Sequence, residues 1–147
     1  MYSRLLVTTD GSDLSAKALQ AAIDLATAMR AELVVLHVVP LYPTSYFEGA
    51  IAYEHGEIAR IERQWGEQGQ ALVDQAAAQA DAAGVKARGV ILRSDLVADS
   101  VIAAATKYEC DLVVMASHGR RGIGRVLLGS ETLHVLTHST VPVLVLR

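Results

Sequence analysis

The segment from Ala116 to Ser130 has the residue types that bind anions. It contains four glycines, at which the backbone can turn tightly and approach a ligand without a Cβ atom in the way. Its last two residues, Gly129 and Ser130, precede a helix-like run, so backbone N–H groups and the positive end of a helix dipole should face outward there. Three arginines add positive charge to the segment: Arg120, Arg121 and Arg125. This pattern is typical of a phosphate site.

The same segment also has a purely structural interpretation. A glycine-rich connection between a buried strand and a helix is common, and serine is a good N-cap residue. The segment is not a P-loop, because no lysine stands between Gly129 and Ser130, and its glycines do not follow the dinucleotide-binding order. Taken alone, the segment leaves both interpretations open.

The elements that must position this segment alternate strictly between strand and helix patterns. Apolar runs predict strands over 4–9, 32–39, 85–92, 111–116 and 141–146. Amphipathic patterns predict helices over 14–30, 53–83, 96–108 and 130–138. This alternation predicts one doubly wound α/β domain over residues 1–147, with a five-stranded parallel sheet ordered 3-2-1-4-5 and two helices on each face.

Local signals mark the ends of these helices. The expected N-caps are Ser12 or Asp13 for the first helix and Ser94 or Asp95 for the third. Gly66 and Gly69 weaken the pattern of the second helix. Because that helix is long, its first half is expected to project past the sheet, with Trp65 at an edge or an interface.

Ligands of doubly wound folds bind beyond the carboxyl ends of the strands, where the strand order switches. Asp10, Val38 and Ala116 lie at those ends, after the first, second and fourth strands. This coincidence supports ligand binding more strongly than the glycine-rich segment does alone. Asp10 is still open to two roles, because a carboxylate beside Gly11 can also complete a turn or cap a helix.

Composition limits the class of protein. The formal net charge of −3 argues against a nucleic-acid or anionic-membrane partner, so the basic segment is a local feature. The single cysteine, Cys110, excludes an internal disulfide and fits a reducing compartment. The sequence starts directly with a strand pattern, and no apolar run approaches membrane-spanning length. These features predict a cytoplasmic protein without membrane insertion.

The glycine-rich segment resembles the nucleotide-binding motif of the universal stress protein family. The family pattern is G-x-x-G, nine residues, then G-S, and here it reads Ala116-Ser-His-Gly119, nine residues, Gly129-Ser130. Ala116 replaces the first glycine. The resemblance covers essentially the whole chain, with further similar stretches at 6–12, 36–39 and 141–146. It implies the adenine nucleotide alpha-hydrolase-like version of the predicted fold.

The resemblance implies ATP as the ligand, or ADP or AMP, with Mg²⁺ bridging the phosphates if ATP is bound. Asp10 would hold the ribose hydroxyls, and the backbone N–H and C=O of Val38 would hydrogen-bond the edge of adenine. Arg120 and Arg121 would form a lid over the phosphates. The nucleotide-binding residues that it implies are Thr9, Asp10, Val38, Ala116, His118, Gly119, Arg120, Gly129, Ser130 and Glu131.

Several polar residues have competing interpretations. His118 can meet a phosphate or transfer a proton, or it can be an exposed loop residue. Glu131 departs from the small or apolar residue that is usual in the family, and a carboxylate just inside a helix start is expected to compete for the dipole and repel phosphate. His134 and His138 lie four residues apart, as zinc ligands can, but no third ligand has suitable spacing, so no metal site is predicted.

The function implied by the resemblance is that of a stress-response protein which works as a binding or regulatory module. No catalytic residue is predicted, and ATP hydrolysis is expected to be slow at most. Two alternatives stay open. One is a dimeric stress scaffold that needs no nucleotide, which Ala116 and Glu131 favour, and the other is a slow ATP-hydrolysing enzyme on the same fold.

The last strand pattern, Val141–Leu146, predicts a homodimer. Its residues are apolar on both faces at what should be a sheet edge, and such an edge associates unless another chain covers it. Pro142 lacks an N–H group, which limits pairing near the start of the strand only. The resemblance implies antiparallel pairing of two such strands across a two-fold axis.

Overall fold

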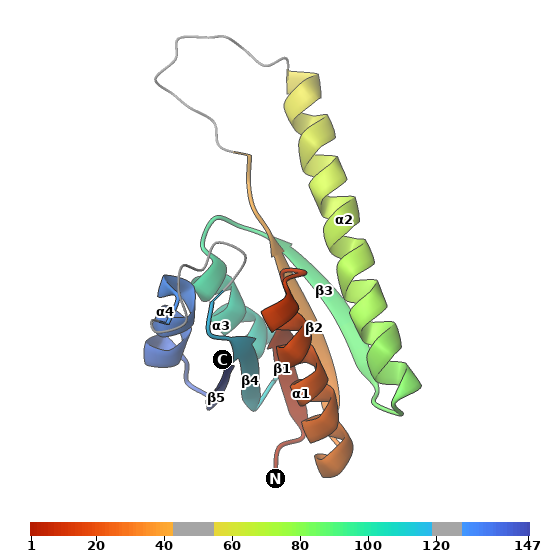
Figure 1. Ribbon diagram of the computed structural model, residues 1–147. Helices are drawn as coiled ribbons and strands as arrows, with labels where there is room; N and C mark the ends of the chain where they lie inside the picture. Colours follow the sequence, from red (N-terminus) through yellow and green to blue (C-terminus); the bar gives the residue numbers. More distant parts are fainter. Residues whose placement is uncertain (43–54, 119–127) are drawn as a thin grey trace.

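The computed structural model describes residues 1–42, 55–118 and 128–147, which contain five strands and four helices (Figure 1). The strands are β1 (Arg4–Thr8), β2 (Glu32–Val39), β3 (Ala87–Arg93), β4 (Leu112–Ala116) and β5 (Val143–Leu146). The helices are α1 (Asp13–Met29), α2 (His55–Ala82), α3 (Val97–Lys107) and α4 (Ser130–His138). All predicted elements are present, with ends that differ by at most about two residues from the sequence patterns.

The five strands form one parallel sheet in the order β3-β2-β1-β4-β5, which confirms the predicted topology. Val7 of β1 lies beside Val35 of β2 and Val114 of β4. The carboxyl ends of these three central strands therefore meet at one edge of the sheet, where the strand order switches.

The sheet has an apolar layer on each face, because successive side chains of a strand point to opposite faces. Helices pack on both layers. Leu5 and Val7 pack in one buried cluster with residues of α1 and α2. Leu6 and Val113 pack in the other cluster with residues of α3 and α4. Two helices therefore cover each face, as predicted (Figure 1).

The N-cap predictions are right for α1 and wrong for α3. Ser12 caps α1, and its hydroxyl accepts a hydrogen bond from the Ser15 N–H. The N-cap of α3 is Leu96, whose side chain makes no capping bond. Ser94 instead accepts from the Leu96 N–H at 3.0 Å, and Asp95 accepts from the Leu41 N–H at 3.2 Å. Both side chains are thus used in the connection before the helix.

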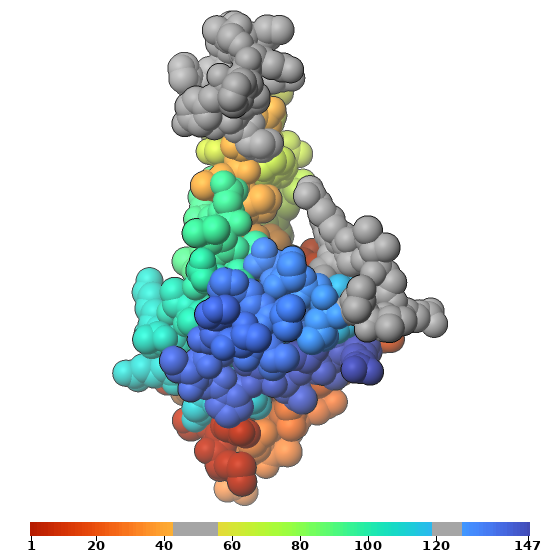
Figure 2. Space-filling model, turned by 90° about the vertical axis from the view of Figure 1, so that its left-hand side faces the viewer, coloured from red at the N-terminus to blue at the C-terminus, as the bar shows by residue number. Residues whose placement is uncertain are grey.

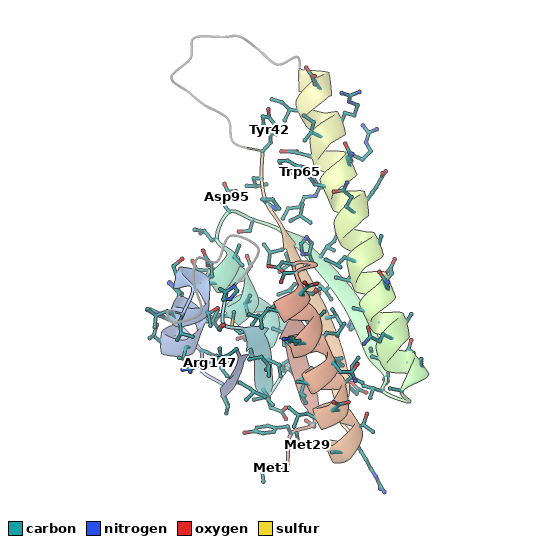
Figure 3. The ribbon with its side chains drawn as sticks, viewed as in Figure 1. Met1, Met29, Tyr42, Trp65, Asp95 and Arg147 are labelled. Carbon is teal, nitrogen blue, oxygen red and sulfur yellow. The ribbon has the colours of Figure 1, made fainter. Side chains whose placement is uncertain are left out.

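Helix α2 runs unbroken through Gly66 and Gly69 for 28 residues, a length of about 42 Å. A Cβ atom on Gly69 would lie 2.8 Å from His37 Cδ2 on β2, so glycine is needed there because the helix lies so close to the sheet. The first part of α2 extends beyond the carboxyl edge, as predicted (Figure 1). There Trp65 stacks on Tyr42, with 6.0 Å between ring centroids (Figure 3).

Cys110 is buried, and this burial raises the pKa of its thiol to about 11, so the thiol stays neutral near pH 7. Among the helices of the described residues, none has the length and apolar character needed to cross a bilayer.

Candidate functional site

The turn after β1 brings polar groups to the carboxyl edge. Gly11 adopts a φ of +80°, which glycine tolerates, and this conformation lets the chain reverse into α1. The Ser12 N–H donates to Asp10 Oδ1 at 2.9 Å, so the carboxylate completes the turn. Thr9 is buried, and its N–H donates to the Leu36 carbonyl of β2. Asp10 therefore occupies a fixed position at the end of β1.

Ser15 belongs to this turn, although the sequence analysis did not select it. Its side chain is buried, and its hydroxyl donates to the Ser12 carbonyl at 2.9 Å. The same oxygen lies 3.3 Å from Thr9 Oγ1 and 3.4 Å from the Asp10 N–H nitrogen. The available signal was its place on the apolar face of α1, three residues before Ala18, where a buried hydroxyl requires partners.

The backbone of Val38 faces the side of β2 on which β1 ends. The Thr9 N–H donates to the Leu36 carbonyl, so Leu36 directs its polar groups toward β1. Val38 lies two residues later, so its backbone N–H and C=O also point toward the β1 side of β2. Val38 lies beyond the Thr9–Leu36 bond and past the end of β1. One N–H donor and one C=O acceptor therefore stand side by side at the carboxyl edge.

His37 links the ends of β1 and β2. Its Nδ1 lies 2.7 Å from the Thr9 carbonyl oxygen, and because a carbonyl only accepts, this nitrogen carries the proton. The bond fixes the position of the β2 end relative to the turn that contains Asp10. No pattern in the sequence predicts this contact.

The start of α4 lies against the end of β4. The Gly129 N–H donates to the Ser117 carbonyl at 2.7 Å, and the buried Thr132 hydroxyl donates to the Ala116 carbonyl at 2.9 Å. Gly129 is the N-cap of α4, so the exposed Ser130 is its first helical residue rather than its cap. The N–H groups of this first turn have no partner within the helix, an arrangement that suits an anion.

Gly129 is needed for close packing rather than for an unusual backbone angle. Its φ is −60°, which any residue can adopt. A Cβ atom there would lie 3.3 Å from both the Ser117 carbonyl oxygen and His118 Cα, tighter than most Cβ contacts. A larger side chain would therefore push α4 away from the end of β4.

The Glu131 carboxylate is bound to the neighbouring helix. Its Oε2 accepts a hydrogen bond from the Ala98 N–H in the first turn of α3, at 2.8 Å. The sequence had suggested that this carboxylate competes for the dipole of α4. The structure shows instead that its hydrogen bond is made at the positive end of α3.

The family model for the universal stress protein family matches residues 1–147, the whole chain. This chain belongs to the universal stress protein family. It is 34% identical over 149 residues to the universal stress protein YxiE of Bacillus subtilis, with both chains covered in full.

Solved structures of other universal stress proteins have the same fold. The universal stress protein UspA from Lactobacillus plantarum aligns with a TM-score of 0.84 over 99% of this chain and 98% of its own, at 23% identity. A universal stress protein in complex with cAMP aligns with a TM-score of 0.68 at 27% identity, covering 99% of this chain and 97% of its own. That relative therefore binds an adenine nucleotide.

In this universal stress protein, the structure brings together only part of the predicted set. Asp10 follows β1, Ala116 is the last residue of the neighbouring strand β4, and Val38 is linked to the Thr9 turn through His37. His118, partly buried, follows Ser117 at the end of β4. Gly119, Arg120, Arg121 and Arg125 lie outside the described residues.

The paired histidines of α4 lie with their rings stacked, 4.3 Å between centroids. His134 Nε2 lies 3.1 Å from Asp99 Oδ1 on α3, so the pair contributes to helix packing. Within residues 1–42, 55–118 and 128–147, no group of three His, Cys, Asp or Glu side chains is arranged to hold a metal ion.

A cleft of about 290 Å³ lies at the opposite, amino edge of the sheet. Its carboxylate Glu32 accepts from Lys86 at 3.0 Å and from Arg4 at 2.9 Å, and these bonds hold the pKa of Glu32 below its ordinary value. Arg4 also donates to the Tyr108 carbonyl at 2.8 Å. The polar groups of this cleft are engaged with one another, and none of the predicted nucleotide-binding residues lines it.

Proposed function

We propose that this universal stress protein binds an adenine nucleotide, ATP or else ADP or AMP, at the carboxyl ends of β1, β2 and β4, and acts as a binding or regulatory module. One observation carries the proposal. Groups suited to a base, a ribose and a phosphate lie at the carboxyl ends of three neighbouring strands, at the point where the strand order switches. The cAMP-bound relative supports the same class of ligand.

Each part of the nucleotide has a matching group. The N–H and C=O of Val38 suit the donor and acceptor edge of adenine, and the Asp10 carboxylate suits the two ribose hydroxyls. The first turn of α4, which begins after Gly129, suits the phosphates. We assign further phosphate contacts to Ala116, Gly119 and Ser130. The nucleotide-binding set that the resemblance implies also includes Thr9, His118, Arg120 and Glu131.

Mg²⁺ would enter this site on the phosphates of ATP. The described residues hold no cluster of three carboxylate, histidine or cysteine ligands, so phosphate oxygens and water would supply most of its coordination. Its role would be to offset phosphate charge, and the protein would hold it through the nucleotide.

We propose binding rather than catalysis, with slow ATP hydrolysis at most. At the described carboxyl edge, the side chains beside the Asp10 turn are hydroxyls already hydrogen-bonded within it, such as Thr9 and Ser15. Turnover of ATP above the background of a heat-denatured sample would favour the enzyme alternative. The cytoplasmic location also stays part of this proposal.

A homodimer through β5 is the second part of the proposal. β5 is an edge strand, and Leu144 on it is 38% exposed. Leu133 and Leu136 of the adjacent α4 are 50% and 43% exposed, and Figure 2 shows α4 and β5 on one continuous face. These exposed leucines also favour the alternative of a dimeric scaffold that needs no nucleotide.

Two measurements test these proposals. Mass spectrometry of ligand released from freshly purified protein should identify an adenine nucleotide, and calorimetry should find ATP, ADP or AMP binding with no binding of GTP. No adenine nucleotide in either experiment would leave the scaffold alternative. Light scattering should give twice 15.7 kDa for the wild type and 15.7 kDa for Leu144→Glu; a monomeric wild type would contradict the dimer.

A further inference from the structure

Helix α3 begins without a capping side chain of its own. Its N-cap residue is Leu96, and the two polar residues before it, Ser94 and Asp95, bond elsewhere. The Ala98 N–H in its first turn instead donates to Glu131, a residue 33 positions later in the chain. Glu131 therefore supplies to α3 what an N-cap side chain normally supplies.

The first turn of α4 is held on two sides. Gly129 and Thr132 bond to carbonyl groups at the end of β4, at 2.7 and 2.9 Å. Glu131, between them in sequence, bonds to α3 at 2.8 Å. About one turn further along α4, His134 lies 3.1 Å from Asp99 of α3. The bonds to β4 fix the distance of the turn from the sheet, and the bond from Glu131 fixes its position beside α3.

We propose that Glu131 is a positioning residue for phosphate recognition. Its carboxylate anchors the first turn of α4 to α3 and thereby orients the backbone N–H groups of Ser130 and Thr132 toward the phosphate of a bound nucleotide. This inference rests on the proposed function, because it concerns the same nucleotide site.

The charge of Glu131 is compatible with this role. A carboxylate that accepts a backbone N–H at a helix start is stabilised by a charge-assisted bond and by the helix dipole. Glu131 thus occupies the positive end of α3. Of these two helices, α4 therefore has the N-terminus that can take a ligand anion. Glu131, where the family pattern has a small or apolar residue, thus gives α4 an anchor.

Three substitutions distinguish the effect of the length of the Glu131 side chain from the effect of its charge. Glu131→Ala removes the acceptor, Glu131→Asp keeps the charge but shortens the side chain by one methylene, and Glu131→Gln keeps the length and an acceptor oxygen without the charge. Glu67→Ala, which removes an exposed glutamate on α2, is the matched control. Thermal unfolding checks that each variant folds.

The binding experiment compares AMP with adenosine, which lacks the phosphate. Loss of a hydrogen bond to a charged group changes an equilibrium constant by roughly 10- to 100-fold. Glu131→Ala and Glu131→Asp should therefore weaken AMP binding by about 10-fold or more. Adenosine binding should not change, and Glu131→Gln should bind AMP within about 3-fold of the wild type. Equal weakening of AMP and adenosine, or unchanged AMP binding in Glu131→Ala, would overturn the proposal.

Amide hydrogen exchange without nucleotide gives a second, independent reading. Exchange at Ala98 and at the two hydrogen-bonded amides around the first turn of α4, Gly129 and Leu133, should accelerate about 10-fold or more in Glu131→Ala and Glu131→Asp, and stay near the wild-type rate in Glu131→Gln and Glu67→Ala. Unchanged exchange in Glu131→Ala would overturn the anchoring role. If the wild type binds none of ATP, ADP, AMP and adenosine, the proposed function fails, and these exchange rates still decide whether Glu131 anchors α4.

Discussion

The two edges of the sheet carry different polar groups. At the amino edge, charged side chains are paired with one another. At the carboxyl edge, the polar groups are mostly hydroxyls and the backbone N–H and C=O groups at the ends of neighbouring strands. At the amino edge, Asp111 accepts from the Ser3 N–H and hydroxyl, both at 2.8 Å, and from the Arg4 N–H at 3.1 Å. At the carboxyl edge, the N–H and C=O of Val38 lie past the end of β1, and the N–H groups in the first turn of α4 have no partner within the helix. The amino edge is built for stability, and the carboxyl edge is suited to a ligand.

The carboxyl edge should be disrupted most strongly by Gly129→Val. Its Cβ would meet the backbone of Ser117 and His118 at 3.3 Å, and a β-branched side chain needs more room still. We expect nucleotide affinity to fall at least about 100-fold, which is about 2.7 kcal/mol of binding free energy. The free energy of unfolding, measured by thermal unfolding, should change by much less than this. Calorimetry measures the affinity. Gly56→Val is the control, since a Cβ at Gly56 meets nothing within 4 Å, and near-wild-type binding by Gly129→Val would contradict the phosphate assignment.

At the amino edge, Asp111→Asn should lower stability without affecting binding. Partial burial raises the pKa of Asp111, but the hydrogen bonds from Ser3 and Arg4 outweigh it and hold the pKa below its ordinary value. Asparagine would place a donor against one of these donors, so we expect a loss of about 1 kcal/mol in the free energy of unfolding at pH 7.

The pH dependence of this effect follows from the direction of the shift. Because the folded pKa is lowered, the carboxylate contributes its stability fully above the unfolded value of about 4, and that contribution is lost as pH falls through the lowered folded pKa. Urea unfolding should therefore show the wild type and Asp111→Asn converging below about pH 4. A difference that persists at pH 2, or a loss of nucleotide affinity at pH 7, would contradict this account.

Lys86→Ala should have the smallest effect. The Lys86 side chain is 82% exposed, and its ion pair with Glu32 lies at the surface, where salt screens it. We expect a change in unfolding free energy smaller than that of Asp111→Asn, disappearing in 1 M salt, with unchanged nucleotide affinity. Urea unfolding at low and high salt measures it. A large effect that is independent of salt would show that this pair does more than add surface charge.

Much of the fold could be predicted because its signals are local or repetitive. Strand runs apolar on both faces, such as Leu33–Leu36, predict a sheet covered by helices, and Ser12 predicts the cap of α1 because a cap acts within one turn. The same reasoning failed at α3. Its cap comes from Glu131, and a contact across 33 residues leaves no pattern in the sequence near Ser94.

Motifs in the sequence mark Asp10, Ala116 and Gly129, and the structure places them at the ends of β1 and β4 and at the start of α4. Ser15 and His37 were missed, because their role depends on which buried groups lie beside them in three dimensions. Gly69 looked like a weak point of α2, and only the distance to His37 shows that it permits close packing of the helix on β2.

Hydrogen exchange measured with and without saturating ATP tests the contrast between the two edges most directly. The account predicts slower exchange for backbone amides at Val38, at Asp10–Ser12 and in the first turn of α4, with no change at Arg4, Glu32 and Asp111. Protection confined to the amino edge, or no protection anywhere at a concentration that saturates the protein with adenine nucleotide, would contradict the assignment of the nucleotide site to the carboxyl ends of β1, β2 and β4.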